Sequence, residues 1–123
     1  RRLVEEQTRH AGTQWPTVLR QAVHFIDAHY AEPLQLTAVA DHCEVSAGYL
    51  SRLFSEHLDV AFNDHLNTVR LEVAERLLEE GSRSIKEIAG EVGYQDPNYF
   101  SRIFKKFKGI SPTRFARGEA DGG

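Results

Sequence analysis

The chain has 123 residues, of which 41% are apolar and 27% charged, with a formal net charge of −3 and one cysteine. This size and composition fit one compact soluble unit, or two small units that share a helix. The single cysteine excludes a disulfide framework within the chain and fits a reducing compartment, and no apolar run approaches the length of a membrane span.

The charge is unevenly distributed along the chain. From Ala31 to Val69 one basic residue stands against six acidic ones, whereas from Ser82 to Gly118 eight basic residues stand against three acidic ones. A local basic patch, rather than the net charge of a domain, determines whether it binds phosphate. The negative net charge therefore does not exclude a nucleic-acid partner.

The first residues, 1–14, are polar, and the chain contains no methionine even at position 1. We expect a piece of a longer protein and interpret this segment as a flexible connector from an absent upstream domain. A disordered tail is an equally good interpretation.

Three helices are expected in the first half. The first runs from about Thr17 to Tyr30 and ends before Pro33, because the residue before a proline resists helical angles. A short helix from about Leu36 to Cys43 leads into a turn, and Ser46 caps the next helix, about Ala47–His57. Two short helices joined in this way are typical of a helix-turn-helix, whose second helix can enter a major groove.

A long helix is expected next, from about Phe62 to Glu80. Its apolar stripe is read as Phe62, Leu66, Val69, Val73 and Leu77. At 1.5 Å per residue its length is roughly 28 Å. Two recognition helices on one face of B-DNA lie about 34 Å apart, so a rigid spacer of this size can link them. The shortfall suggests that the DNA bends or that one helix engages poorly.

The second half repeats the pattern. Ser84–Glu87 is a capping box that starts a short helix, and Gly93 ends it. Asp96 can cap the following helix, about Pro97–Lys108, which has a strong apolar stripe. Its opposite face carries donors that read base edges and bind phosphates, namely Asn98, Ser101, Arg102, Lys105 and Lys106. A last short helix follows Ser111–Pro112.

The segment Tyr49–Phe54 matches Tyr99–Phe104, fifty residues later, with Tyr, Ser, Arg and the final Phe identical. A repeat of this length indicates a supersecondary unit used twice. In an isolated helix, an arginine on the outer face would be interpreted as solvated surface. The recurrence of Ser-Arg on the outer face of both copies, where packing does not require it, favours a binding role.

The string IKEIAGEVGYQDPNYFSRIFKKFKGISPTRFAR resembles the signature of the AraC/XylS family of bacterial transcription regulators. The first copy, LTAVADHCEVSAGYLSRLFSEHLDVAFNDHL, resembles that family's first helix-turn-helix, and the resemblance covers about Thr17–Arg117. It implies an all-α domain of seven helices, in which a long linker helix joins two homeodomain-like helix-turn-helix subdomains. The expected boundaries are 15–61 for the first subdomain, 62–81 for the linker, 82–118 for the second subdomain and 119–123 for a disordered tail.

The resemblance also implies a function. Such a domain binds double-stranded promoter or operator DNA in two adjacent major-groove segments, and it often activates transcription through contact with RNA polymerase. It follows a separate sensing or dimerisation domain, acts in the bacterial cytoplasm at the nucleoid, and is not an enzyme. We expect the fragment to be monomeric, with dimerisation of the parent protein left open.

The residues expected to contact DNA lie on the two recognition helices. Those carried over by position from the family are Gly48, Ser51, Arg52, Pro97, Asn98, Ser101 and Arg102. Side-chain chemistry adds the helix cap, two phosphate-binding lysines and two tyrosines that brace their helices with some backbone contact: Ser46, Lys105, Lys106, Tyr49 and Tyr99. An arginine suits guanine or phosphate, and Asn98 suits adenine.

The first copy departs from the family's pattern. It has Ser55-Glu56 where two basic residues are frequent, Gly48 where a larger side chain is frequent, and Asp59 in place of a glycine. A carboxylate near a phosphate opposes binding. We therefore expect the first helix-turn-helix to contribute less affinity than the second.

Two other classes of function fit the sequence less well. A module that binds another protein's helix needs an exposed apolar groove, but each stripe is used by its own core. An enzyme or ligand-binding bundle needs inward-facing polar groups, and none is evident in the sequence. The six histidines lack metal-ligand spacing, and no cofactor motif occurs. Steep salt dependence of binding would distinguish DNA binding from an apolar groove.

Overall fold

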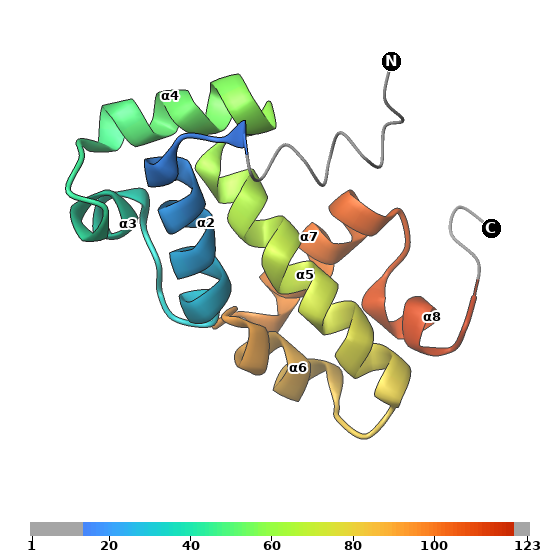
Figure 1. Cartoon of the computed structure of the whole chain (residues 1–123). Coiled ribbons are helices and arrows are strands. Elements are labelled where there is room, and N and C mark those ends of the chain that lie inside the picture. The colour runs from blue at the N-terminus through green and yellow to red at the C-terminus, as the bar shows by residue number, and fades with distance from the viewer. Residues whose placement is uncertain (1–13, 120–123) are drawn as a thin grey trace, which may run out of the picture. The chain divides into compact units, whose positions relative to one another are not determined.

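The computed structural model describes residues 14–119, and in that range it contains seven helices and no strand (Figure 1). The helices are α2 (Thr17–His29), α3 (Leu36–His42), α4 (Ala47–Leu58), α5 (Phe62–Glu80), α6 (Ile85–Val92), α7 (Pro97–Lys108) and α8 (Pro112–Ala116). The all-α prediction is confirmed, and the helix ends fall within a residue or two of those expected. The predicted connector at residues 1–13 and the tail at residues 120–123 lie outside the described residues.

The chain divides into two compact units. The first comprises the described residues up to His29 together with Leu34–His65, and the second comprises Tyr30–Pro33 together with the chain from Leu66 onward. Helix α5 therefore begins in the first unit and continues through the second. The subdomain boundaries expected from sequence, with the long helix as a separate linker, remain predictions.

The first unit packs α2, α3 and α4 against one another. Phe54 of α4 is fully buried, and its ring meets that of Phe62 edge-on, with centroids 6.0 Å apart. Cys43 is buried next to α3, and its thiol faces the carbonyl of Val18 at 3.9 Å, as expected of a small core residue. Ser46 begins α4 because its hydroxyl accepts a hydrogen bond from the amide of Tyr49 at 3.1 Å.

The second unit packs α6 on α7 and α7 on α8, with α5 contributing to the same core. The predicted capping box is present: the amide of Ser84 donates to Glu87 Oε1 at 2.8 Å, and the amide of Glu87 donates to Ser84 Oγ at 3.1 Å. Asp96 caps α7 by accepting from the amide of Asn98 at 2.9 Å. The buried core residues are Leu71, Ala74, Leu78, Ile88, Ala89, Val92, Tyr94, Phe100 and Phe104.

The stripe predicted for α5 is partly wrong. Phe62 and Leu66 are buried as expected, but Val69, Val73 and Leu77 are only half-buried. The buried face instead continues at Arg70, Leu71, Ala74 and Leu78. An apolar stripe does not include an arginine, because a charged side chain at a core position is rare unless it is paired. The pattern therefore did not predict the burial of Arg70. The expectation that no polar group faces inward is wrong for the same reason.

Arg70 is only 8% exposed, and its guanidinium is hydrogen-bonded to main-chain oxygens. Its Nε donates to the carbonyl of Tyr30 at 2.7 Å, and its Nη2 donates to the carbonyl of Glu32 at 2.9 Å. These bonds hold the segment Tyr30–Pro33 within the second unit. Burial lowers the pKa of Arg70 from its ordinary value, but an arginine begins so far above neutrality that it stays charged.

Candidate nucleic-acid interface

Helix α7 presents the predicted polar face to solvent. Asn98, Arg102, Lys105 and Lys106 are exposed, and Ser101 is half-buried. Phe100 and Phe104 are fully buried on the other side, which fixes the rotation of the helix in its unit. The exposed face therefore carries amide, guanidinium and ammonium donors, the groups that bind base edges and phosphates. Pro97, at the first position of the helix, is half-buried.

Helix α4 presents a sparser face. Gly48, Ser51 and Arg52 are exposed, and a Cβ added at Gly48 would meet no atom within 4 Å. The absence of a side chain at Gly48 therefore leaves open surface beside Arg52. Ser46 is exposed as well, but its hydroxyl already serves as the helix cap.

Helices α4 and α7 each carry a tyrosine beneath an arginine. The Arg52 guanidinium carbon lies 5.4 Å from the centroid of the Tyr49 ring, and that of Arg102 lies 5.7 Å from the Tyr99 ring. Both distances are within the range of cation–π attraction. Tyr49 is 38% exposed and Tyr99 is 42% exposed, so both pairs lie on the surface. Each tyrosine ring therefore supports an arginine, a contact that their i, i+3 spacing could have indicated. The bracing of each helix by its tyrosine, with some contact to the DNA backbone, stays a prediction.

The two arginines differ in their acidic neighbours. Arg52 Nε lies 3.8 Å from Glu56 Oε2, one helical turn further along α4. Between residues 14 and 119 no ion pair is found at Arg102, and the position that corresponds to Glu56 holds Lys106. The same helix-turn-helix scaffold therefore carries an arginine beside a carboxylate in α4 and, within the described residues, an arginine without an acidic partner in α7.

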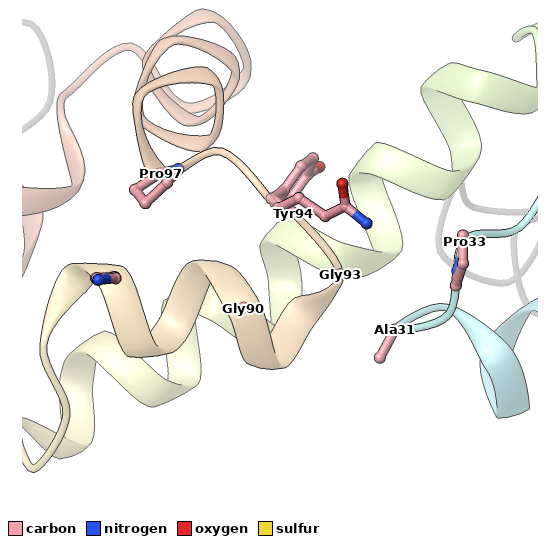
Figure 2. A pocket seen from close by; sticks show the side chains of 8 residues that line it. Ala31, Pro33, Gly90, Gly93, Tyr94 and Pro97 are labelled. Carbon is pink, nitrogen blue, oxygen red and sulfur yellow. The ribbon is translucent and has the colours of Figure 1, made fainter.

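A surface cavity of about 350 Å³ lies beside the turn between α6 and α7. Figure 2 shows Gly90 on α6, Tyr94 in the turn, and Ala31 and Pro33 of the neighbouring segment around it. Lys86 is the one charged side chain of its lining. The lining holds no nucleophile with an adjacent base, and no acid–base pair, so it lacks the groups of a catalytic site.

The described part of the chain contains no group of three or more His, Cys, Asp or Glu side chains that could hold a metal ion. Among the helices of residues 14–119, none is long and apolar enough to cross a membrane.

Residues 39–118 match the helix-turn-helix domain family. The chain is also similar to a solved transcriptional regulator from Chromobacterium violaceum, described as having an AraC-type DNA-binding domain. The identity is 30%, the match covers 92% of this chain and 99% of that chain, and the TM-score is 0.81. The chain belongs to the AraC-type helix-turn-helix family. This is a family of transcription regulators and not of enzymes, which confirms both expectations drawn from the sequence.

Two further comparisons bear on function. An uncharacterised helix-turn-helix transcriptional regulator of Escherichia coli, YijO, is 40% identical over 76% of this chain and 33% of its own length. The DNA-binding domain of the global transcriptional factor AdpA, solved in complex with a target DNA, is 26% identical, with a TM-score of 0.78 over 84% of this chain and 93% of that chain. The chain spans about a third of the length of the curated relatives that it matches. Membership of this family implies DNA binding for transcription regulation.

Proposed function

We propose that this AraC-type domain binds double-stranded promoter or operator DNA through α4 and α7, each of which enters a major-groove segment. The observation that carries the proposal is the recurrence of an exposed Tyr–Arg pair on the second helix of each helix-turn-helix. Packing does not require either arginine, because both helices bury their opposite faces. A guanidinium held over a ring is restrained before it meets a base edge or phosphate.

In α7, we assign Arg102 to the bidentate contact with guanine or phosphate and Asn98 to adenine. Lys105 and Lys106 follow on the same exposed side and bind the phosphate backbone. Ser101, Pro97 and Tyr99 contribute shorter contacts with sugar and phosphate. Three of the four basic residues of α7, Lys105, Lys106 and Lys108, lie in its last turn, and the attraction they supply weakens with added salt.

In α4, Arg52 takes the role of Arg102, with Ser51 and Tyr49 beside it and Gly48 leaving room for close approach. Ser46 caps the start of the helix, where the remaining backbone amides of the first turn can donate to a phosphate. Arg52 is the one lysine or arginine of this helix. We infer that α7 supplies most of the affinity and α4 a smaller share.

We also propose that the parent protein carries a separate sensing or dimerisation domain. The curated relatives support this, because each is about three times the length matched here. On this proposal the domain is monomeric by itself, contacts RNA polymerase when bound at a promoter, and acts in the bacterial cytoplasm, where the DNA is.

Selection of bound sequences from a random duplex pool at moderate salt tests the proposal. Two enriched boxes about one helical turn apart would mean that both helices read bases. One enriched box would mean that only one of the two helices reads bases. Absence of any salt-sensitive binding by the folded domain would overturn the proposal and favour a protein-binding role.

A further inference from the structure

We infer that Glu56 competes with DNA for Arg52, so that position 56 determines how much the first helix-turn-helix contributes to binding. This inference rests on the proposed function of α4 and α7. It assigns a role to a residue that contacts no base and opposes the contact of its neighbour.

The geometry places the carboxylate within reach of the guanidinium and leaves both in water. The Arg52 and Glu56 side chains are 64% and 56% exposed, and their nearest charged atoms are 3.8 Å apart. An exposed pair of this kind stabilises a helix little. Its main consequence is therefore electrostatic: it cancels the one lysine or arginine charge of α4.

The surroundings of α4 are acidic. In the described part of the first unit, Arg20 and Arg52 stand against six carboxylates: Asp27, Asp41, Glu44, Glu56, Asp59 and Asp64. Among these, Glu56 is the one that is paired with Arg52. A phosphate or guanine that binds Arg52 competes with this carboxylate for the guanidinium charge, and the carboxylate then lies close to the DNA backbone.

Helix α7 supplies an internal comparison. Arg102 lies over Tyr99 as Arg52 lies over Tyr49, so the cation–π contact is shared. The residue four positions later is Lys106 in α7 and Glu56 in α4. A lysine at this position repels the guanidinium and attracts phosphate, whereas a glutamate does the opposite. The charge at this position therefore has opposite signs in the two helices, and α7 carries two further lysines, Lys105 and Lys108.

The test is a double-mutant cycle on the duplex selected by the wild-type chain, with Arg52→Ala, Glu56→Gln and the double variant. Loss of one repulsive charge and one competing partner should make Glu56→Gln bind about fivefold more tightly at low salt, with a smaller gain at high salt. Arg52→Ala should cost no more than about twofold in the wild-type background and about tenfold in the Glu56→Gln background.

Asp27→Asn is the matched control, because it removes an exposed carboxylate from α2 of the same unit. It should leave the affinity within about twofold of wild type, since only weak screened repulsion is lost. Lys106→Glu is the reciprocal change, and it should make the effect of Arg102→Ala small. Circular dichroism of each variant checks that the helices persist.

The outcomes separate the inference from the proposed function. If Glu56→Gln binds no better than Asp27→Asn, or if Arg52→Ala costs as much as Arg102→Ala in the wild-type chain, the inference is wrong while DNA binding stands. If the wild-type domain shows no salt-sensitive binding to any duplex, the proposed function itself fails, and with it the premise of the inference.

Discussion

The guanidinium carbon of Arg70 lies 5.2 Å from the centroid of the Tyr94 ring, inside the second unit. Tyr94 is 5% exposed, and its hydroxyl donates to Asn67 Oδ1 at 2.5 Å. Arg70 in turn donates to the carbonyls of Tyr30 and Glu32. The buried side chains of Arg70 and Tyr94 thus have hydrogen-bond partners inside the unit, and a buried charge without such partners would be strongly destabilising. Arg70 holds the segment after α2 on the unit that carries α7.

Replacing Arg70 by methionine should destabilise the domain by about 2–4 kcal/mol, because two carbonyls lose their donors and the buried network loses its centre. Urea unfolding followed by circular dichroism measures the change. Arg76→Met on the exposed side of the same helix is the control and should fall within about 0.5 kcal/mol of wild type. Equal unfolding free energies for the two variants would show that the hydrogen bonds of Arg70 contribute nothing to stability.

Gly93 and Gly90 lie three residues apart and should respond in opposite directions to alanine. Gly93 has φ +109°, and a Cβ there would lie 2.9 Å from Arg70 Nε and 3.0 Å from the carbonyl oxygen of Tyr30. Gly93→Ala should therefore cost about 2–3 kcal/mol from backbone strain and displacement of Arg70. A Cβ at Gly90, inside α6, meets no atom within 4 Å, so Gly90→Ala should stabilise by about 0.5–1 kcal/mol.

Thermal unfolding of both variants checks this pair of predictions. The midpoint of Gly93→Ala should fall and that of Gly90→Ala should rise. A rise for both would show that the chain can relax around a side chain at Gly93.

Tyr94 should make the fold sensitive to alkaline pH. Burial raises the pKa of Tyr94 from 10.0 to about 12. The unfolded phenol ionises at lower pH than the folded one, so its contribution to stability is complete below pH about 10 and is lost as the pH rises toward about 12. Phenolate absorbance of wild type minus that of Tyr94→Phe should show a midpoint near 12. A midpoint near 10 would mean that water reaches this hydroxyl.

Arg102→Ala should weaken binding to the selected duplex by about 10- to 100-fold, since one bidentate contact is lost from the more basic helix. Arg52→Ala should weaken it far less. Fluorescence anisotropy titrations of the two variants side by side measure the ratio, and equal losses would contradict the asymmetry between the helices.

Lys106→Ala should remove a contact with the phosphate backbone and leave the base-sequence preference unchanged. It should lower affinity for the selected duplex and for a scrambled duplex alike, and it should reduce the slope of log K against log salt by about 0.9. A change confined to the selected duplex would instead assign Lys106 to base reading.

The ring of Tyr99 should matter more than its hydroxyl. Tyr99→Leu removes the surface beneath Arg102 and should weaken binding about threefold to tenfold, whereas Tyr99→Phe keeps a ring there and should bind within about twofold of wild type. Tyr99 also contacts the Tyr94 ring, with centroids 5.9 Å apart, so either substitution can change the stability of the domain. The thermal unfolding midpoint of each variant is therefore compared with that of the wild type. Equal binding by the two variants at equal stability would exclude a role for the cation–π contact.

Local features of the fold could be predicted because each depends on a few residues that are close together in the sequence. The cap at Ser46, the capping box at Ser84 and the helix end at Gly93 each depend on residues within one turn, and each occurs as expected. The exposed face of α7 followed from its apolar stripe for the same reason. The family could be identified because its signature is a contiguous string.

The pairing of Arg52 with Glu56 was in principle accessible, since both partners lie on one helix at i, i+4 spacing. The sequence suggested that Glu56 opposes DNA binding, and it did not identify the arginine as the group that Glu56 neutralises. The stacking of each arginine on its tyrosine also involves residues only three positions apart. The sequence did not predict it, because a tyrosine next to a core stripe is ordinarily interpreted as a brace for its helix.

The helices, their caps and the polar face of α7 could be predicted from sequence because they depend on residues close together along the chain. The repeat could be found by comparing two segments of the sequence directly. Only the tertiary structure decided that Arg70 is buried, because its partners are carbonyls of Tyr30 and Glu32, some forty residues away. Periodicity assigns a charged residue to the surface unless a partner is known. The same long-range contact explains why a side chain at Gly93 is unfavourable, because Arg70 and the Tyr30 carbonyl already occupy the space for a Cβ.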